Sequence, residues 1–161
     1  MELDKPYQGA FRGSTHHFAL RVYIEDTDVG GVVYHARYVG FLERARSDML
    51  RCLGIDQWGA IQSGEGVYAV TELSIKYVKP ARLDDDLVIL TTVTELRAVT
   101  CGIAQVIRRG GDVVSQAKLT AAFLNRAGRP HRHPVPWAEK FQAVLSSAPE
   151  LAPGAHANPK S

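Results

Sequence analysis

The spacing of apolar residues predicts one long helix early in the chain. From Tyr38 to Leu53, apolar side chains recur at steps of three and four residues, which places them on one side of a helix. Gly54 follows directly, and glycine commonly ends helices. The predicted apolar face consists of Tyr38, Phe41, Leu42, Ala45, Met49, Cys52 and Leu53.

After Gly66 the apolar residues alternate with polar ones, which is typical of strands with one buried face. Leu73, Ile75 and Tyr77 follow this alternation, and Pro80 ends it. The other predicted strands cover residues 17–25, 87–96, 100–108 and 113–124, with a tight hairpin at Gly110-Gly111. One face of the last strand is expected to hold Val113, Ser115, Ala117, Leu119, Ala121 and Phe123.

The order of these elements predicts an α+β fold. A single long helix precedes four strands that are joined by short turns, so we expect an antiparallel sheet curled around that helix. A parallel sheet would need crossover helices between the strands, and the sequence offers none there. We expect one domain over residues 17–145, a flexible segment over 1–16, and a disordered tail rich in Ala, Pro and Ser over 146–161.

Composition narrows the classes of function. The 161 residues are 45% hydrophobic and 22% charged, as in a globular domain, and no apolar run is long enough for a membrane span. The net charge of +2 is too small to indicate a nucleic-acid partner. Cys52 and Cys101 have no paired spacing, so we expect neither a disulfide framework nor a cysteine-based zinc site, and a cytoplasmic location fits best. We also expect no other metal site and no cofactor.

The segment EDTDVGGVVYH, residues 25–35, holds the candidate chemistry. It places Asp26, Asp28 and His35 around the junction between the first strand and the helix. The first turn of a helix offers unpaired N–H groups that can polarise a carbonyl. A carboxylate beside such donors can attack the carbonyl or activate water, so the segment suits acyl transfer.

Structural explanations for the same residues remain open. Asp26 or Asp28 can cap the helix or an Asx-turn, and His35 can be a structural histidine. A calcium loop is excluded, because the twelfth position counted from Asp26 is Arg37 where a glutamate is needed. The start of the segment also resembles the nucleophile motif of haloacid-dehalogenase-type phosphatases. That fold needs parallel βα units, which the predicted antiparallel strands do not supply.

The longer stretch RVYIEDTDVGGVVYHARYVGFLERAR, residues 21–46, resembles the signature of hot-dog-fold acyl-CoA thioesterases. The similarity is greatest to the subgroup related to 4-hydroxybenzoyl-CoA thioesterase and associated with the Tol–Pal gene cluster. The segments IKYVKPARLDDDL and NRAGRPHRHP resemble later parts of that family, so the resemblance covers most of the chain, from Phe18 to Pro136. It implies a central helix wrapped by an antiparallel sheet, and hydrolysis of an acyl-CoA thioester.

The resemblance also assigns roles at the junction. The second aspartate of the family's pair is the catalytic carboxylate, which corresponds to Asp28, and the family's histidine corresponds to His35. Backbone amides near Tyr34 and His35 would polarise the thioester carbonyl. Many members of the subgroup carry a tyrosine four residues before the aspartate, where this chain has Ile24. A hydroxyl role would then be absent, or supplied by Tyr23 or Tyr34.

Other candidates bind substrate rather than react with it. Glu43 lies near the apolar stripe and either pairs with Arg44 or Arg46 or takes part in the site. Basic groups suit the phosphates of coenzyme A or of a phosphopantetheine carrier, although a solvated basic face is the alternative. The expected substrate-binding residues are Gly31, Val33, Tyr38, Glu43, Lys79, Arg82 and Arg129.

The expected partners follow from the same resemblance. The substrate is an acyl-CoA or an acyl-carrier protein, and pairing of sheet edges would give a homodimer or homotetramer. The competing hypothesis is a hot-dog module that binds acyl-CoA or acyl-carrier protein without catalysis. Loss of Asp28 would leave the binding by such a module unchanged, whereas it would impair the activity of an enzyme.

Overall fold

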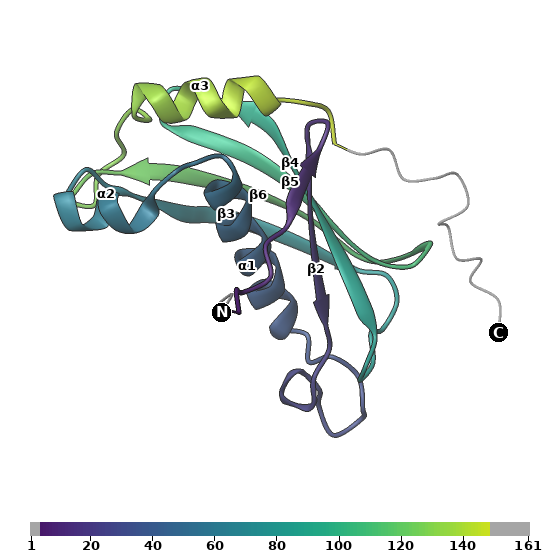
Figure 1. The fold of residues 1–161 in the computed structure, drawn as a ribbon. Coiled ribbons are helices and arrows are strands. Elements are labelled where there is room, and N and C mark those ends of the chain that lie inside the picture. Colours follow the sequence, from purple (N-terminus) through teal and green to yellow (C-terminus); the bar gives the residue numbers. More distant parts are fainter. Residues whose placement is uncertain (1–3, 149–161) are drawn as a thin grey trace.

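A six-stranded antiparallel sheet curves around helix α1 (Arg37–Cys52) in the computed structural model, which describes residues 4–148 (Figure 1). The sheet order is β1-β2-β4-β5-β6-β3. This confirms the α+β class and the antiparallel arrangement. The strands are β1 (Ala10–Arg12), β2 (Thr15–Arg21), β3 (Val67–Tyr77), β4 (Asp86–Leu96), β5 (Thr100–Arg109) and β6 (Asp112–Leu124).

Helix α1 buries the apolar face that its sequence predicts. Leu42, Ala45 and Met49 are completely buried against the sheet, because their spacing keeps them on one side of the helix. The helix ends within one residue of the predicted position. Gly54 then turns the chain with a φ of 74°, in the left-handed region that favours glycine.

Besides strand β1, three short elements were not predicted. Helix α2 (Gln57–Ser63) begins at Asp56, whose carboxylate accepts the Gly59 amide at 3.0 Å. Helix α3 (Val135–Val144) packs its buried Phe141 among the side chains between the sheet and α1. The 3-10 turn η1 (Ile24–Asp26) replaces the end of the strand expected over 17–25. Within the described part of the chain, no helix is long and apolar enough to cross a membrane.

The sheet begins earlier than the domain start expected at residue 17. Strand β1 pairs with β2, and His16 is completely buried. At the other end of the chain, the Ser146 amide donates to the Val93 carbonyl at 3.0 Å. The remainder of the expected tail, residues 149–161, lies outside the described residues.

A β-bulge divides the predicted face of β6. Ile107 pairs with Ser115 and Arg108 pairs with Val113, so Val114 is an extra residue in β6. Residues of β6 that precede the bulge therefore face the side of the sheet opposite to the one that strict alternation predicts. Val114 joins the core beneath α1, whereas Val113 packs with Leu90 and Val106 in a separate cluster. The prediction that Val113 shares the face of Ala117 and Leu119 was therefore wrong.

A buried polar network connects α1 to the sheet. Gln105 Oε1 accepts a hydrogen bond from Arg46 Nη1 at 2.9 Å. The Gln105 amide group donates to the Leu42 carbonyl at 3.1 Å and to Thr91 Oγ1 at 3.0 Å. Arg46 also forms an ion pair with Glu43, which is 62% exposed. Gln105 supplies the hydrogen bonds to the buried polar groups of this network. Glu43 contacts the Arg46 guanidinium from the more exposed side.

We expect Gln105→Leu to lower the free energy of unfolding by about 2–4 kcal/mol, because Arg46 and Thr91 lose a buried partner. The control Glu43→Gln keeps an acceptor for the Arg46 guanidinium on the half-exposed side of the pair, so it should cost less, about 1 kcal/mol. Urea unfolding followed by circular dichroism measures both. Equal losses in the two variants would contradict this description of the network.

Candidate active site

A hydrogen-bonded turn joins η1 to helix α1. The Asp28 amide donates to the Val32 carbonyl at 2.9 Å, and the Gly31 amide donates to the Asp28 carbonyl at 3.1 Å. Gly31 has a φ of 77°, so the turn needs a residue without a side chain at this position. The Val33 amide then bonds to the Ala81 carbonyl at 2.8 Å, which fixes the turn to the loop after β3.

Asp26 has the structural role that the sequence left open. Its side chain is buried, and Oδ2 accepts the Tyr23 amide at 2.9 Å. Its other oxygen accepts from Arg37 Nη2 at 2.6 Å and from Arg37 Nε at 3.0 Å. This ion pair raises the pKa of the Arg37 guanidinium. Asp26 therefore holds the turn against the first residue of α1.

Asp28 is exposed, and only one of its two carboxylate oxygens accepts hydrogen bonds. Its Oδ1 accepts the Gly30 amide at 2.8 Å and the Val32 amide at 3.4 Å, as in an Asx-turn. Among the described residues, none donates a hydrogen bond to Asp28 Oδ2. The two amides orient the carboxylate, and its second oxygen is free to meet a reacting group or a water.

Asp28 and His35 line one open cleft of about 360 Å³. The cleft also holds three residues expected to bind substrate, Val33, Tyr38 and Lys79. Sequence reasoning missed its other walls, which are Val32, Tyr77, Val78 and Pro80. The position of Tyr77 at the end of an alternating strand, just before Pro80, was a usable signal for this wall.

Tyr77 also fixes the start of the helix. Its hydroxyl donates to the His35 carbonyl at 2.9 Å. The Tyr38 hydroxyl lies deeper and accepts the Ala81 amide at 3.3 Å, and burial raises the pKa of this phenol. The two rings meet edge to face at 5.3 Å. Two aromatic rings in contact therefore line the cleft together with the exposed carboxylate.

The backbone donors around the helix start differ from each other. The Tyr34 amide donates to the Asp26 carbonyl at 2.9 Å, so it is engaged within the turn. The Tyr34 ring is exposed and lies 4.5 Å from the His35 ring. No bond among the described residues uses the amides of His35 and Ala36, and no side chain caps α1. These two amides have the unpaired character expected of a helix N-terminus.

Lys79 forms an ion pair at the rim of the cleft. Its Nζ lies 2.9 Å from Asp112 Oδ1, and this contact lowers the pKa of the Asp112 carboxyl. Arg82 forms an isolated bridge with Val32 and is exposed, so its backbone lies beside the cleft. Gly31 shapes the turn but does not line the cleft.

Two expected substrate-binding residues lie elsewhere in this chain. Glu43 pairs with Arg46 and borders a separate small cavity of about 60 Å³ under α1. Arg129 belongs to a turn after β6, whose end pairs with the start of β3 at Val67. The cleft lies at the far end of β3, about 30 Å away along the strand.

A second cluster of side chains, outside the cleft, has atoms that can bind a metal ion. Within residues 4–148, a single group of three potential metal ligands occurs, formed by His16, Asp48 and Cys52. It lies at the C-terminal end of α1, away from the cleft. Neither cysteine forms a disulfide, and Cys101 is buried in the core.

Comparisons with known proteins agree with the fold and identify the family. The family model described as the thioesterase superfamily matches residues 30–116. The acyl-CoA thioesterase YbgC of Haemophilus influenzae is 42% identical over 108 residues, which cover 67% of this chain and 79% of that protein. The 1,4-dihydroxy-2-naphthoyl-CoA hydrolase of Thermosynechococcus vestitus is 32% identical over 132 residues, covering 81% and 88% respectively.

Solved structures extend the agreement to three dimensions. A probable thioesterase from Bartonella henselae superimposes with a TM-score of 0.71 at 36% identity, covering 74% of this chain and 99% of that one. The wrapped-helix architecture expected from the resemblance is therefore confirmed. With more than half of its residues matched by the family model and most of its fold shared with such structures, this chain belongs to the thioesterase superfamily.

Proposed function

We propose that this chain hydrolyses acyl-CoA thioesters in the cleft beside the start of α1, with Asp28 as the catalytic carboxylate. The observation that carries the assignment is the environment of Asp28, which lines the cleft: backbone amides hold one of its oxygens, and no described residue donates a hydrogen bond to the other. Relatives of this chain that are named acyl-CoA thioesterase and CoA hydrolase support the reaction class. The products are a carboxylic acid and the free thiol of coenzyme A.

The chemistry needs a nucleophile and donors for the developing oxyanion. Asp28 Oδ2 either attacks the thioester carbon and expels the coenzyme A thiolate, giving a mixed anhydride that water then hydrolyses, or takes a proton from a water that attacks the same carbon and displaces the thiolate. The amides of His35 and Ala36 are the oxyanion donors in this proposal, because the Tyr34 amide is already bonded to Asp26. Asp26 contributes by positioning the turn through Arg37.

His35 has a positioning or protonating role in this proposal. Its side chain lines the cleft, and its carbonyl is held by Tyr77. The thiolate of coenzyme A is a good leaving group, so strong acid catalysis is not required. The exposed Ile24 offers no hydroxyl where many relatives of the subgroup have one, and the Tyr38 hydroxyl is buried and bonded to Ala81.

The substrate side of the proposal rests on charge at the rim. Lys79 borders the cleft and Arg82 follows it on the same loop, so a phosphate group can approach both cations. Coenzyme A and a phosphopantetheine carrier both present such groups. We infer a cytoplasmic location for this activity, in keeping with two cysteines that are free thiols.

We also propose that two copies associate through β3, as a homodimer that can pair into a tetramer. This strand is an eleven-residue edge of the sheet, and it leaves Val67 and Val70 about 40% exposed. An unpaired edge of this length is prone to pair with another strand. The other edge, β1, has only three residues and offers little to a partner.

Asp28→Asn should lower kcat on acyl-CoA by at least about 100-fold, because the amide neither attacks a thioester nor accepts a proton from water. A free-thiol release assay on acetyl- to palmitoyl-CoA, benzoyl-CoA and hydroxybenzoyl-CoA measures this loss and ranks the acyl groups. Glu25→Gln, an exposed carboxylate three residues away, is the matched control and should retain activity.

Three results would contradict the assignment. Near-native turnover of Asp28→Asn together with inactive His35→Ala would move the catalytic role to the histidine. Equal losses in Asp28→Asn and Glu25→Gln would indicate a nonspecific charge effect. Binding of acyl-CoA by the wild-type chain without turnover, unchanged in Asp28→Asn, would support the binding-module hypothesis instead.

Lys79→Ala should raise KM for acyl-CoA by about tenfold while changing kcat little, because a cation at the rim binds phosphate in the ground state and the transition state alike. The effect should shrink as salt concentration rises. Lys76→Ala is the control, since Lys76 is exposed and lies outside the cleft lining. An unchanged KM in Lys79→Ala at low salt would remove Lys79 from the binding site.

Light scattering after size exclusion should give at least twice the mass of one chain. Thr71→Lys should shift the distribution toward monomer, because Thr71 is the exposed bulge residue of β3 and two introduced charges would meet at the paired edges. Gln142→Lys on α3 is the matched surface control. A monomeric wild-type chain, or an unchanged mass of Thr71→Lys, would refute association through this edge.

A further inference from the structure

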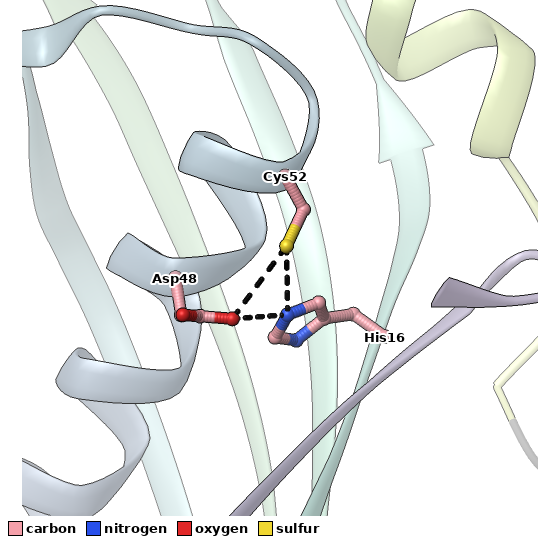
Figure 2. Close-up of side chains that lie close together, drawn as sticks. All are labelled: His16, Asp48 and Cys52. Atoms are coloured by element: carbon pink, nitrogen blue, oxygen red, sulfur yellow. Dashed lines mark hydrogen bonds and ion pairs between the residues drawn. The ribbon is translucent and has the colours of Figure 1, made fainter. Parts of the chain in front are cut away.

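His16, Asp48 and Cys52 form a compact polar cluster where β2 meets the last turns of α1 (Figure 2). His16 Nε2 lies 2.7 Å from Asp48 Oδ2. Cys52 Sγ lies 3.7 Å from the same nitrogen and 3.6 Å from the same oxygen. Asp48 and Cys52 are four residues apart on α1, so both side chains face His16. Nothing in the proposed thioesterase mechanism uses these residues.

The arrangement is convergent, as in a metal site. A relay of nucleophile, base and acid uses the two ring nitrogens of histidine for different partners. Here Nε2 faces both the carboxylate and the thiol, while Nδ1 is buried with no hydrogen-bond partner in the described structure. A Cys–His–Asp catalytic relay is therefore excluded, and three different donor atoms point to one place.

The main chain closes over the cluster at Gly9. The Gly9 amide donates to Asp48 Oδ2 at 2.9 Å, and its carbonyl accepts from the Cys52 thiol at 3.4 Å. A Cβ at this position would lie 2.8 Å from Asp48 Oδ2 and 3.0 Å from His16 Nε2. Only glycine lets the backbone approach this closely, so a fourth donor atom, the Gly9 carbonyl oxygen, borders the three side chains.

We propose that His16 Nε2, Asp48 Oδ2 and Cys52 Sγ form a binding site for a divalent transition-metal ion, with zinc as the best fit. Mixed nitrogen, oxygen and sulfur ligands suit zinc, which binds them at about 2.0–2.3 Å in tetrahedral geometry. That geometry separates ligand atoms by about 3.3–3.6 Å, close to both sulfur distances here. The nitrogen–oxygen pair must widen by roughly 0.6 Å, within reach of a rotamer adjustment.

Metal binding changes the protonation of two ligands. A metal at Nε2 takes the lone pair of that nitrogen, so the bound imidazole is neutral. On binding, the ring proton occupies Nδ1. The Cys52 thiol donates to the Gly9 carbonyl, so it carries a proton that the metal must displace. Each ion bound therefore releases one proton, and the Gly9 carbonyl, freed from the thiol, can serve as fourth ligand.

The site would bind the N-terminal strand to the helix. His16 belongs to β2, whereas the other two ligands belong to α1, so an ion would cross-link elements 32 residues apart in sequence. The cleft lies near Tyr38, about 20 Å away along α1. The ion would thus act on stability rather than on the reacting thioester.

The test adds Co²⁺ or Zn²⁺ to purified full-length protein that has been treated with a chelator and a reductant. We expect one ion per chain, a thiolate-to-cobalt charge-transfer band with tetrahedral cobalt spectra, and release of one proton per zinc. Free zinc at 100-fold above Kd should raise Tm by about 5–10 °C. Cys52→Ser should remove the cobalt band and weaken zinc binding by at least about 100-fold.

Two controls separate this site from adventitious binding. Cys101→Ala removes the other thiol, and His17→Gln changes the neighbouring histidine outside the cluster; both should retain the band. Circular dichroism of Cys52→Ser, whose side chain is only partly buried, checks that the variant folds. Absence of stoichiometric binding by the wild-type chain, or a band that survives in Cys52→Ser, would overturn the proposal.

Discussion

Burial of one face of helix α1 inside the curved sheet is the constraint on which the rest of the structure depends. The side chains of Leu42, Ala45 and Met49 are completely buried, and the core clusters around them take side chains from β2, β4, β5 and β6. The sheet must therefore curl, and the bulge at Val114 contributes to this bending. A curled sheet brings the loop after β3 over the N-terminal end of α1, where the cleft forms.

The two neighbouring carboxylates show how this constraint sets chemistry. Asp26 is drawn into the protein, because Arg37 at the start of α1 and the Tyr23 amide together satisfy its charge. Asp28 lies two residues further along a turn that points outward, so only backbone amides contact it. A buried, paired carboxylate is fixed and unreactive, whereas an oriented, solvent-facing one can react. This difference in environment is why the proposed catalytic role falls on Asp28 and not on Asp26.

The sequence was sufficient for the main elements and insufficient where long-range contacts decide. The helix was predicted almost to the residue, because its stripe and Gly54 are local signals. The fold class and the thioesterase family were likewise predicted correctly from local patterns and a long motif. Val113 was assigned to the wrong face, because one extra residue in β6 shifts the register and leaves no mark in the alternation. Helix α2 has a local signal in its Asp56 cap, which was overlooked.

Side-chain partnership is the part of the site that periodicity does not encode. A stripe argument placed Glu43 beside a buried face, and it left open whether the carboxylate pairs or binds substrate. In the structure, the Glu43 carboxylate pairs with Arg46. The other contact of Arg46 is Gln105, which lies on a strand 59 residues away in the sequence. His16 illustrates the stronger case: it lay in a segment expected to be flexible, yet it is fully buried against Asp48. A polar residue enters a core only when a distant partner satisfies it, so its burial depends on tertiary contact and not on its own surroundings in the sequence.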